Sequence, residues 1–198
     1  MGISEYYTVL GSSEGYYKDK SSKFIALAYH VESEEEAKDV ITSVKKKYYD
    51  ARHHCYAFRI NPEKEFSRSS DDGEPSGTAG KPILNQLLSH ELYNVIVIVV
   101  RYFGGTKLGV SGLILAYKSS TLNALQNSKI VKKFITSPVE LCFQYPLMNE
   151  VMRVIKEENI KIINQDFTSD CKIFVEIKKK SKKNTLEKFK KIRGVKTT

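Results

Sequence analysis

One apolar run limits the folds open to this chain more than any other feature. Residues 95–100 read Val-Ile-Val-Ile-Val-Val, six β-branched residues without polar alternation. Such a segment favours a β-strand that protein covers on both faces. Glycine-rich loops flank it, and seven of the eleven glycines fall within residues 73–112. Since glycines gather where the backbone turns sharply or approaches a ligand, we expect any functional site at the C-terminal end of this strand.

Composition describes an ordinary globular protein. Hydrophobic residues make up 41% and charged residues 28% of the 198 positions, which is typical of soluble domains. The three cysteines, Cys55, Cys142 and Cys171, are odd in number and far apart, so a disulfide framework is not expected. The chain also shows no signal-peptide pattern and no apolar stretch of membrane-spanning length. We therefore expect a cytoplasmic protein without a membrane partner.

The net charge of +9 is unevenly distributed along the sequence. Residues 1–128 carry 15 basic and 15 acidic side chains, whereas residues 129–198 carry 17 basic and 8 acidic ones. This asymmetry favours a polyanionic partner, and RNA or the ribosome is the expected one. The alternative is a general preference for lysine on solvated surfaces, because 26 of the 32 basic residues are lysine.

The first 128 residues predict a domain of strands and helices. Strands are expected at residues 6–10, 22–31 and 51–60, with a turn region between the first two and a loop over residues 61–76. A capping box at Ser33 predicts a helix that ends near Lys47. Thr78 is expected to cap a second helix that runs to about His90, and a third covers about residues 110–126.

A linker is expected over residues 129–136, followed by a second domain over residues 137–198. Its pattern is strand (138–145), helix (147–158), strand (160–167), strand (171–177) and helix (183–192), which is the ferredoxin-like order without its last strand. Because only residues 195–198 remain, that strand should be very short or absent. The fold class is therefore α+β with two domains.

The glycine-rich loops predict anion binding. They match neither a Walker loop nor a dinucleotide fingerprint. They do lead into two helix N-termini, near Thr78 and Val110, whose free N–H groups and dipoles attract anions. We expect RNA phosphates to bind at a surface formed by these loops and the strand ends, with these residues: Arg52, His54, Ser76, Thr78, Lys81, Arg101, Tyr102, Gly104, Gly105 and Lys107.

The acids of the first loop admit two interpretations. Asp71, Asp72 and Glu74 could structure the loop, one of them by pairing with Arg101. As an enzyme, the chain could instead use them to bind Mg²⁺ or as acid and base. We favour a protein without catalysis and expect no cofactor. No metal is expected either, because His53 and Cys55 have no second ligand pair at a suitable spacing.

Glycines 109 and 112 also have two interpretations. They could form part of the anion site at the start of the third helix. They could equally let two helices pack closely, because a glycine removes the side chain at the contact.

Three motifs resemble one known family. Residues 71–84, DDGEPSGTAGKPIL, and residues 100–113, VRYFGGTKLGVSGL, closely resemble the signature of the YigZ/IMPACT family. Residues 51–57, ARHHCYA, resemble its third motif. The motifs cover the N-terminal domain, and residues 137–198 resemble the smaller C-terminal domain of bacterial members in pattern and length. Ser111 stands where many relatives have glycine.

The resemblance implies a fold and a cellular role. The N-terminal domain should be a sandwich of sheet and helices like ribosomal protein S5 domain 2. The C-terminal domain should be similar to the last domain of a translocase elongation factor. Eukaryotic relatives regulate translation through an activator of an amino-acid-starvation kinase, although the partner domain they carry is absent here. We thus expect an RNA- or ribosome-associated protein with a role in translation regulation. A nucleotide or phosphoester enzyme and a protein-interaction module remain alternatives.

Overall fold

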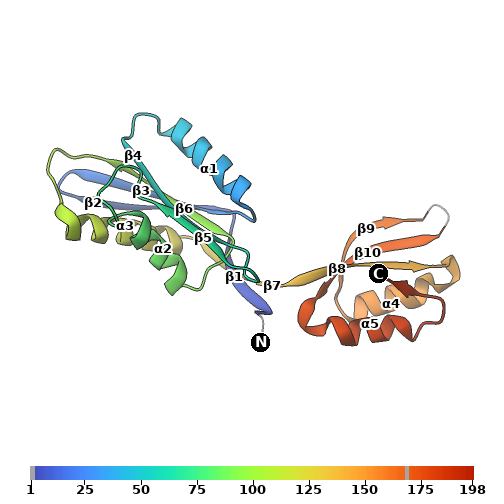
Figure 1. Ribbon diagram of the computed structural model, residues 1–198. Coiled ribbons are helices and arrows are strands. Elements are labelled where there is room, and N and C mark those ends of the chain that lie inside the picture. Colours follow the sequence, from blue (N-terminus) through green and yellow to red (C-terminus); the bar gives the residue numbers. More distant parts are fainter. Residues whose placement is uncertain (1–2, 168–169) are drawn as a thin grey trace. The chain divides into compact units, whose positions relative to one another are not determined.

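The computed structural model describes residues 3–167 and 170–198, which form two compact units. One unit spans residues 6–133, and the other spans residues 134–198 together with the segment that ends at Glu5. Both units combine helices with β-sheets (Figure 1), so the expected α+β class is confirmed. No helix among the described residues is long and apolar enough to cross a membrane.

The N-terminal unit is built on a five-stranded sheet with antiparallel neighbours throughout. In spatial order its strands are β2 (Ser12–Asp19), β3 (Ser22–His30), β6 (Val95–Tyr102), β4 (His53–Ile60) and β5 (Phe66–Ser70). Helix α1 (Glu34–Lys47) lies on one face of the sheet. Helices α2 (Gly80–Ser89) and α3 (Gly109–Gln126) cover the other (Figure 1).

Strand β6 is the centre of this sheet, as its apolar run predicts. All six residues from Val95 to Val100 are completely buried. Val95, Val97 and Val99 pack in the core under α2 and α3, whereas Ile96, Ile98 and Val100 pack in the core under α1. The expectation of a strand covered on both faces is confirmed, and it leaves Arg101 and Tyr102 on opposite faces at the strand's end.

Two strands of the sheet lie where the sequence predicted a turn region and a loop. Strand β2 is largely polar, and at Gly15 the α3 backbone approaches so closely that a Cβ would collide with Ala124. Strand β5 is an exposed edge strand in which Phe66 remains 42% exposed. Few apolar side chains of either strand face the core. The two strands therefore show no alternation of hydrophobic and polar residues that would identify them in the sequence.

The expected linker is also a strand. Residues Lys129–Phe134 form β7, which pairs with β1 (Glu5–Leu10) in a separate two-stranded sheet. Its side chains are mostly exposed, so it shows no apolar period that would identify it in the sequence. Because β7 brings three lysines into the N-terminal unit, residues 6–133 carry 18 basic and 14 acidic side chains, against 14 and 8 for residues 134–198. The charge asymmetry is thus weaker than the sequence division suggested.

The C-terminal unit has the ferredoxin-like strand order. Its sheet runs β11 (Lys196–Thr197), β8 (Thr136–Phe143), β10 (Cys171–Lys178) and β9 (Lys161–Asp166). Helices α4 (Met148–Glu157) and α5 (Lys182–Lys190) contribute to one core with the inward residues of β8 and β10. The last strand has only two residues and is extended by paired hydrogen bonds between the Thr198 and Glu140 backbones.

Candidate functional site

The first glycine-rich loop folds around the carboxylate of Asp71. One Asp71 oxygen accepts the N–H groups of Ala79 and Gly80 at 2.9 and 2.8 Å, and the other accepts the Gly77 N–H at 2.8 Å. The carboxylate thus satisfies donors at the start of α2 that would otherwise lack partners. This end of α2 therefore has little capacity left for an external anion, contrary to what the helix-terminus pattern predicts.

Thr78 does not cap α2 as the sequence suggests. The helix begins at Gly80 with Ala79 at the N-cap position, and the Thr78 hydroxyl donates instead to the Pro75 carbonyl at 2.6 Å. Thr78 itself is buried, whereas Ser76 and Lys81 are exposed. A local side-chain contact has replaced the cap because a carboxylate from outside the helix serves the same N–H groups.

Asp72 ties the same loop to β4 and α1. Its Oδ2 accepts the His54 backbone N–H at 2.7 Å, and its Oδ1 pairs with Lys45 Nζ at 3.0 Å. The carbonyl of Asp72 lies 2.9 Å from Nδ1 of His53. Both carboxylates of the Asp-Asp pair are therefore engaged within the chain, in different directions.

Acid should weaken this loop before the rest of the unit. Partial burial opposes ionisation of Asp71 and Asp72, but hydrogen bonds from backbone N–H groups, joined at Asp72 by the Lys45 ammonium, outweigh it and hold the pKa of each carboxyl below its usual range. The unfolded chain thus binds more protons, and the stabilisation is complete above pH of about 4 and is lost as pH falls through the lowered pKa values. In urea unfolding from pH 6 to pH 3, the difference in free energy of unfolding between the parent and Asp71→Asn should become smaller as the pH falls. The gap for the exposed control Asp39→Asn should stay constant; a constant gap for Asp71→Asn as well would contradict the prediction.

Glu74 and Arg101 form a buried ion pair beneath the loop. Arg101 Nη1 donates to Glu74 Oε1 at 2.6 Å, and the Tyr117 hydroxyl of α3 donates to the same oxygen at 2.8 Å. The two charged side chains are 4% and 7% exposed. Arg101 Nε is buried without a hydrogen-bond partner among the described residues. This pair links the first loop, β6 and α3.

Cys55 completes the buried network without a reactive thiol. Its sulfur lies 3.3 Å from the Tyr117 hydroxyl and 2.9 Å from the Asp71 carbonyl oxygen. Burial raises the pKa of Cys55 to about 12 and also raises the pKa of Tyr117. Both groups are therefore neutral at physiological pH, and Cys55 lacks the thiolate character that nucleophilic cysteines require.

The structure does not bring four of the expected phosphate contacts to one surface: Arg52, His54, Arg101 and Lys107. His54 lies on the α1 face, 6% exposed, with its Nε2 3.0 Å from the Tyr48 carbonyl oxygen. Arg101 is buried on the opposite face. Arg52 and Lys107 remain exposed. Side chains alternate between the two faces along β4, where His53 pairs with Arg101 and His54 pairs with Val100, and this alternation separates His54 from Arg101.

The second glycine-rich loop is shaped by close approach at one glycine and by backbone conformation at two others. The Gly104 N–H donates to Ser22 Oγ at 3.1 Å, and a Cβ at Gly104 would collide with the Ser21 backbone. Gly105 and Gly109 have φ values of +87° and +74° with open space around them. Gly109 therefore serves backbone conformation rather than the close helix packing considered above.

The start of α3 differs from that of α2. No side chain of the described residues caps it, and Gly105, Lys107 and Gly109 around it are exposed. A Cβ added to Gly112 would lie 3.0 Å from the Leu108 side chain of the preceding turn. Of the two helix N-termini in the sequence-based prediction, only this one leaves its N–H groups without a side-chain cap.

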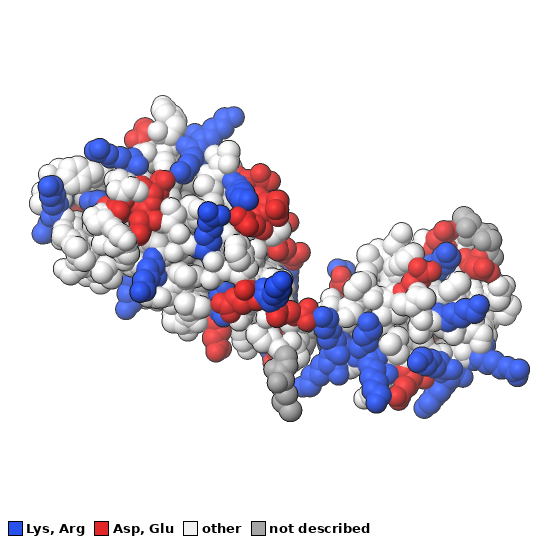
Figure 2. Space-filling view, in the orientation of Figure 1, with Lys and Arg blue, Asp and Glu red and all other residues white. Residues whose placement is uncertain are grey.

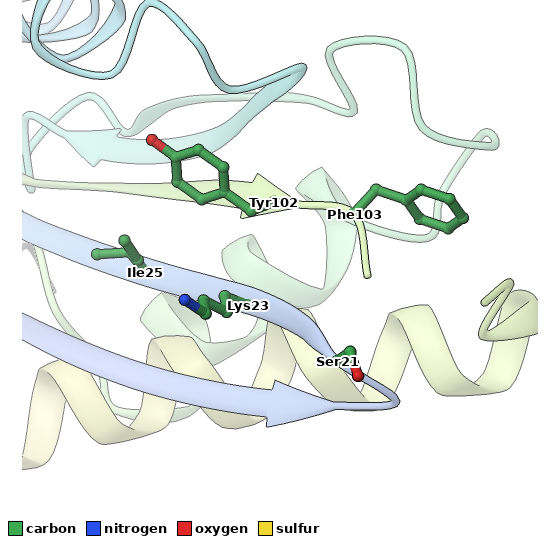
Figure 3. Close-up of a pocket in the computed structure, with 5 residues that line it drawn as sticks. All are labelled: Ser21, Lys23, Ile25, Tyr102 and Phe103. Atoms are coloured by element: carbon green, nitrogen blue, oxygen red, sulfur yellow. The ribbon is translucent and has the colours of Figure 1, made fainter. Parts of the chain in front are cut away.

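A hollow beside Tyr102 contains residues that sequence reasoning missed. Figure 3 shows Ser21, Lys23 and Ile25 along the β2–β3 turn and β3, with Tyr102 and Phe103 at the end of β6. These residues line a hollow of about 380 Å³. Phe103 directly follows Arg101 and Tyr102, so the sequence could have placed it among the expected contact residues. Lys23 precedes Tyr102 by 79 residues in the sequence and becomes its neighbour only through the pairing of β3 with β6.

Comparison with known proteins supports the assignment of this fold and loop pair to one family. Residues 20–125 match the family model of the Impact N-terminal domain. The chain is 32% identical over 178 residues to the IMPACT family member YvyE of Bacillus subtilis (strain 168), covering 89% of this chain and 82% of the relative. It is 36% identical over 150 residues to YigZ of Escherichia coli (strain K12), covering 75% and 74%.

One solved structure extends this likeness to both units. A crystal structure described as that of a hypothetical protein is 28% identical, has a TM-score of 0.72 and covers 98% of this chain and 97% of its own. The two-domain translational regulator Yih1 is also 28% identical, with a TM-score of 0.39 and coverage of 62% of this chain and 47% of its own. The chain belongs to the IMPACT family.

Proposed function

We propose that this protein binds RNA of the translation apparatus and takes part in translation regulation. The observation that carries the proposal is the basic surface of the C-terminal unit. Residues 178–196 contain ten basic residues and one acid, Glu187. Figure 2 shows basic side chains gathered over the α5 side of this unit.

The fold of α5 explains why these charges point outward. The helix buries Thr185 and Phe189 in the core, which leaves Lys183, Lys190 and Lys191 exposed. Lysines held on one side of a rigid unit attract a phosphate backbone without reading its sequence. The surface therefore suits a sequence-independent contact with structured or single-stranded RNA.

The connection to translation comes from the family. Yih1, one solved relative, is described as a two-domain translational regulator. The eukaryotic role implied by the sequence motifs points the same way. The enzyme alternative finds less support, because Asp71, Asp72 and Glu74 already accept hydrogen bonds or pair within the chain.

Co-sedimentation tests the proposal. Tagged protein in cell lysate is run on sucrose gradients at 50 and 200 mM salt, with and without nuclease. We expect migration with ribosomal particles that is lost at high salt or after nuclease treatment. A triple reversal on the C-terminal unit should abolish it: Lys183→Glu, Lys190→Glu and Lys191→Glu. Because three phosphate contacts disappear, the slope of log K against log salt should fall by about 2.

A matched triple reversal on the N-terminal unit separates local contact from net charge. It changes the charge equally at three exposed lysines: Lys38→Glu, Lys64→Glu and Lys118→Glu. Equal loss in both triple variants would show that only total charge matters and would overturn the assignment to α5. Parent protein that stays at the top of every gradient would overturn the RNA proposal itself.

A further inference from the structure

The hollow beside Tyr102 combines aromatic and cationic groups at an open part of the sheet. Lys23 of β3 pairs across the sheet with Tyr102 of β6, so both lie on the α1 face. Figure 3 shows their side chains on neighbouring strands, with Phe103 just beyond the strand end. Phe103 is 54% exposed. Tyr16 of β2 pairs with Ile25 of the lining on the α1 face and is 59% exposed.

The walls of the hollow are held rigidly. The Gly104 N–H bond to Ser22 Oγ and the absence of a Gly104 side chain fix the end of β6 against the β2–β3 turn. That turn places Lys20 and Ser21 at φ values of +43° and +63°. Side chains at two left-handed positions cost conformational energy that glycine would avoid. The chain thus keeps Ser21 in the lining although glycine would suit the backbone better.

Phe103 is supported from the buried side. The Arg101 guanidinium lies 5.5 Å from the Phe103 ring centroid and 5.4 Å from that of Phe24, within cation–π range. The ion pair with Glu74 holds Arg101 in place. An exposed ring fixed in this way loses little conformational freedom when a ligand stacks on it.

The rim of the hollow is positively charged. Lys18, Lys20 and Lys23 are all exposed around the β2–β3 turn. Within residues 3–167 and 170–198, neither Lys18 nor Lys23 takes part in an ion pair. Two acids also lie nearby: Asp50 accepts the Tyr102 hydroxyl at 2.8 Å, and Asp19 stands between Lys18 and Lys20 in the turn. Sites for single-stranded nucleic acid combine aromatic rings, on which bases stack, with cations that neutralise the phosphates.

We propose that this hollow binds one nucleotide of single-stranded RNA, with its base stacked on Phe103 and its phosphate beside Lys23. This inference rests on the proposed function and adds a second, base-contacting site on the other unit. A volume of about 380 Å³ lies in the range of small-ligand pockets. Because every base has a π-face, the site would accept any base.

Fluorescence anisotropy with defined oligomers tests the proposal. The probes are fluorescein-labelled decauridylate, decaadenylate and an abasic ribose-phosphate decamer with the same number of phosphates. For the parent we expect tighter binding to both base-containing probes than to the abasic one. Phe103→Ala should raise Kd for the base-containing probes about tenfold, leaving the salt slope and abasic binding unchanged. Lys23→Ala should weaken all three and reduce the salt slope by about 0.7.

The controls separate this site from the basic surface on α5. Phe66→Ala removes a comparably exposed ring of the same unit and should bind like the parent. The triple α5 variant should lose affinity for all three probes. Equal parent affinity for abasic and base-containing probes, or unchanged binding by Phe103→Ala, would overturn the nucleotide site and leave the proposed function intact. No binding of any probe would overturn both. A protein captured through this face after nuclease treatment, with unchanged oligomer affinity in Phe103→Ala, would replace RNA as its occupant.

Discussion

Glu74→Gln should lower the free energy of unfolding of the N-terminal unit by about 3–5 kcal/mol. The amide keeps the shape of the side chain but leaves the Arg101 guanidinium, 7% exposed, without its counter-charge. The Nε of this guanidinium is already buried without a hydrogen-bond partner in the part of the chain that the structure describes. Burying an uncompensated cation is among the costliest single changes a folded protein can undergo. Urea unfolding followed by circular dichroism measures the loss.

Hydrogen exchange places this loss in the structure. Faster exchange in Glu74→Gln should be concentrated in β6 and α3, because Glu74 links Arg101 to Tyr117. The matched control is Glu34→Gln, which removes a half-buried carboxylate that pairs with Lys38 and Arg68. It should cost less than about 1 kcal/mol. A Glu74→Gln variant no less stable than Glu34→Gln would contradict the prediction.

A double-mutant cycle tests whether the two buried charges act as a pair. Arg101→Leu alone leaves the Glu74 carboxylate buried with the Tyr117 hydroxyl as its remaining donor. The double variant Glu74→Gln, Arg101→Leu removes both charges. It should therefore be less destabilised than the sum of the single variants, by about 1–3 kcal/mol. Additive losses would show that the two side chains stabilise the unit independently.

Asp71→Ala should cost about 3 kcal/mol by releasing three backbone N–H groups at the start of α2. The Gly77, Ala79 and Gly80 donors would lose their charged acceptor together. Asp71→Asn should fall between the parent and Asp71→Ala, because an amide oxygen can still accept from Ala79 and Gly80 whereas its NH₂ group cannot accept from Gly77. Chemical denaturation of the three proteins gives the order directly.

The matched control for Asp71 is Asp39→Ala on the exposed side of α1, for which we expect a change within about 0.5 kcal/mol. Helix α2 should also exchange its amide hydrogens faster in Asp71→Ala than in the control. If Asp71→Ala and Asp39→Ala have the same stability, the carboxylate does not serve as the helix cap.

The sequence determined the central strand, the α+β class and the family. Six adjacent β-branched residues at 95–100 admit little besides a strand covered on both faces, and the two glycine-rich motifs are long enough to be recognised. The same sequence left β2, β5 and β7 undetected. Each is mostly exposed or sits at a sheet edge, so it carries no apolar period. Helix α1 was found with its cap because both signals are local, with Glu36 N–H donating to Ser33 Oγ at 3.1 Å.

Only the tertiary structure decided what the site residues do. The glycine-rich loops predicted that both helix N-termini are open to anions. The structure shows that the Asp71 carboxylate occupies the N-terminus of α2, and the spacing of residues in the loop does not predict this contact. Strand alternation separated Arg101 from His54, and pairing of β3 with β6 brought Lys23 beside Tyr102. Local propensity follows from neighbouring residues, whereas these contacts join residues distant in the chain. These contacts depend on how the strands pair. They also depend on which polar groups are buried away from water and must find hydrogen-bond partners within the protein.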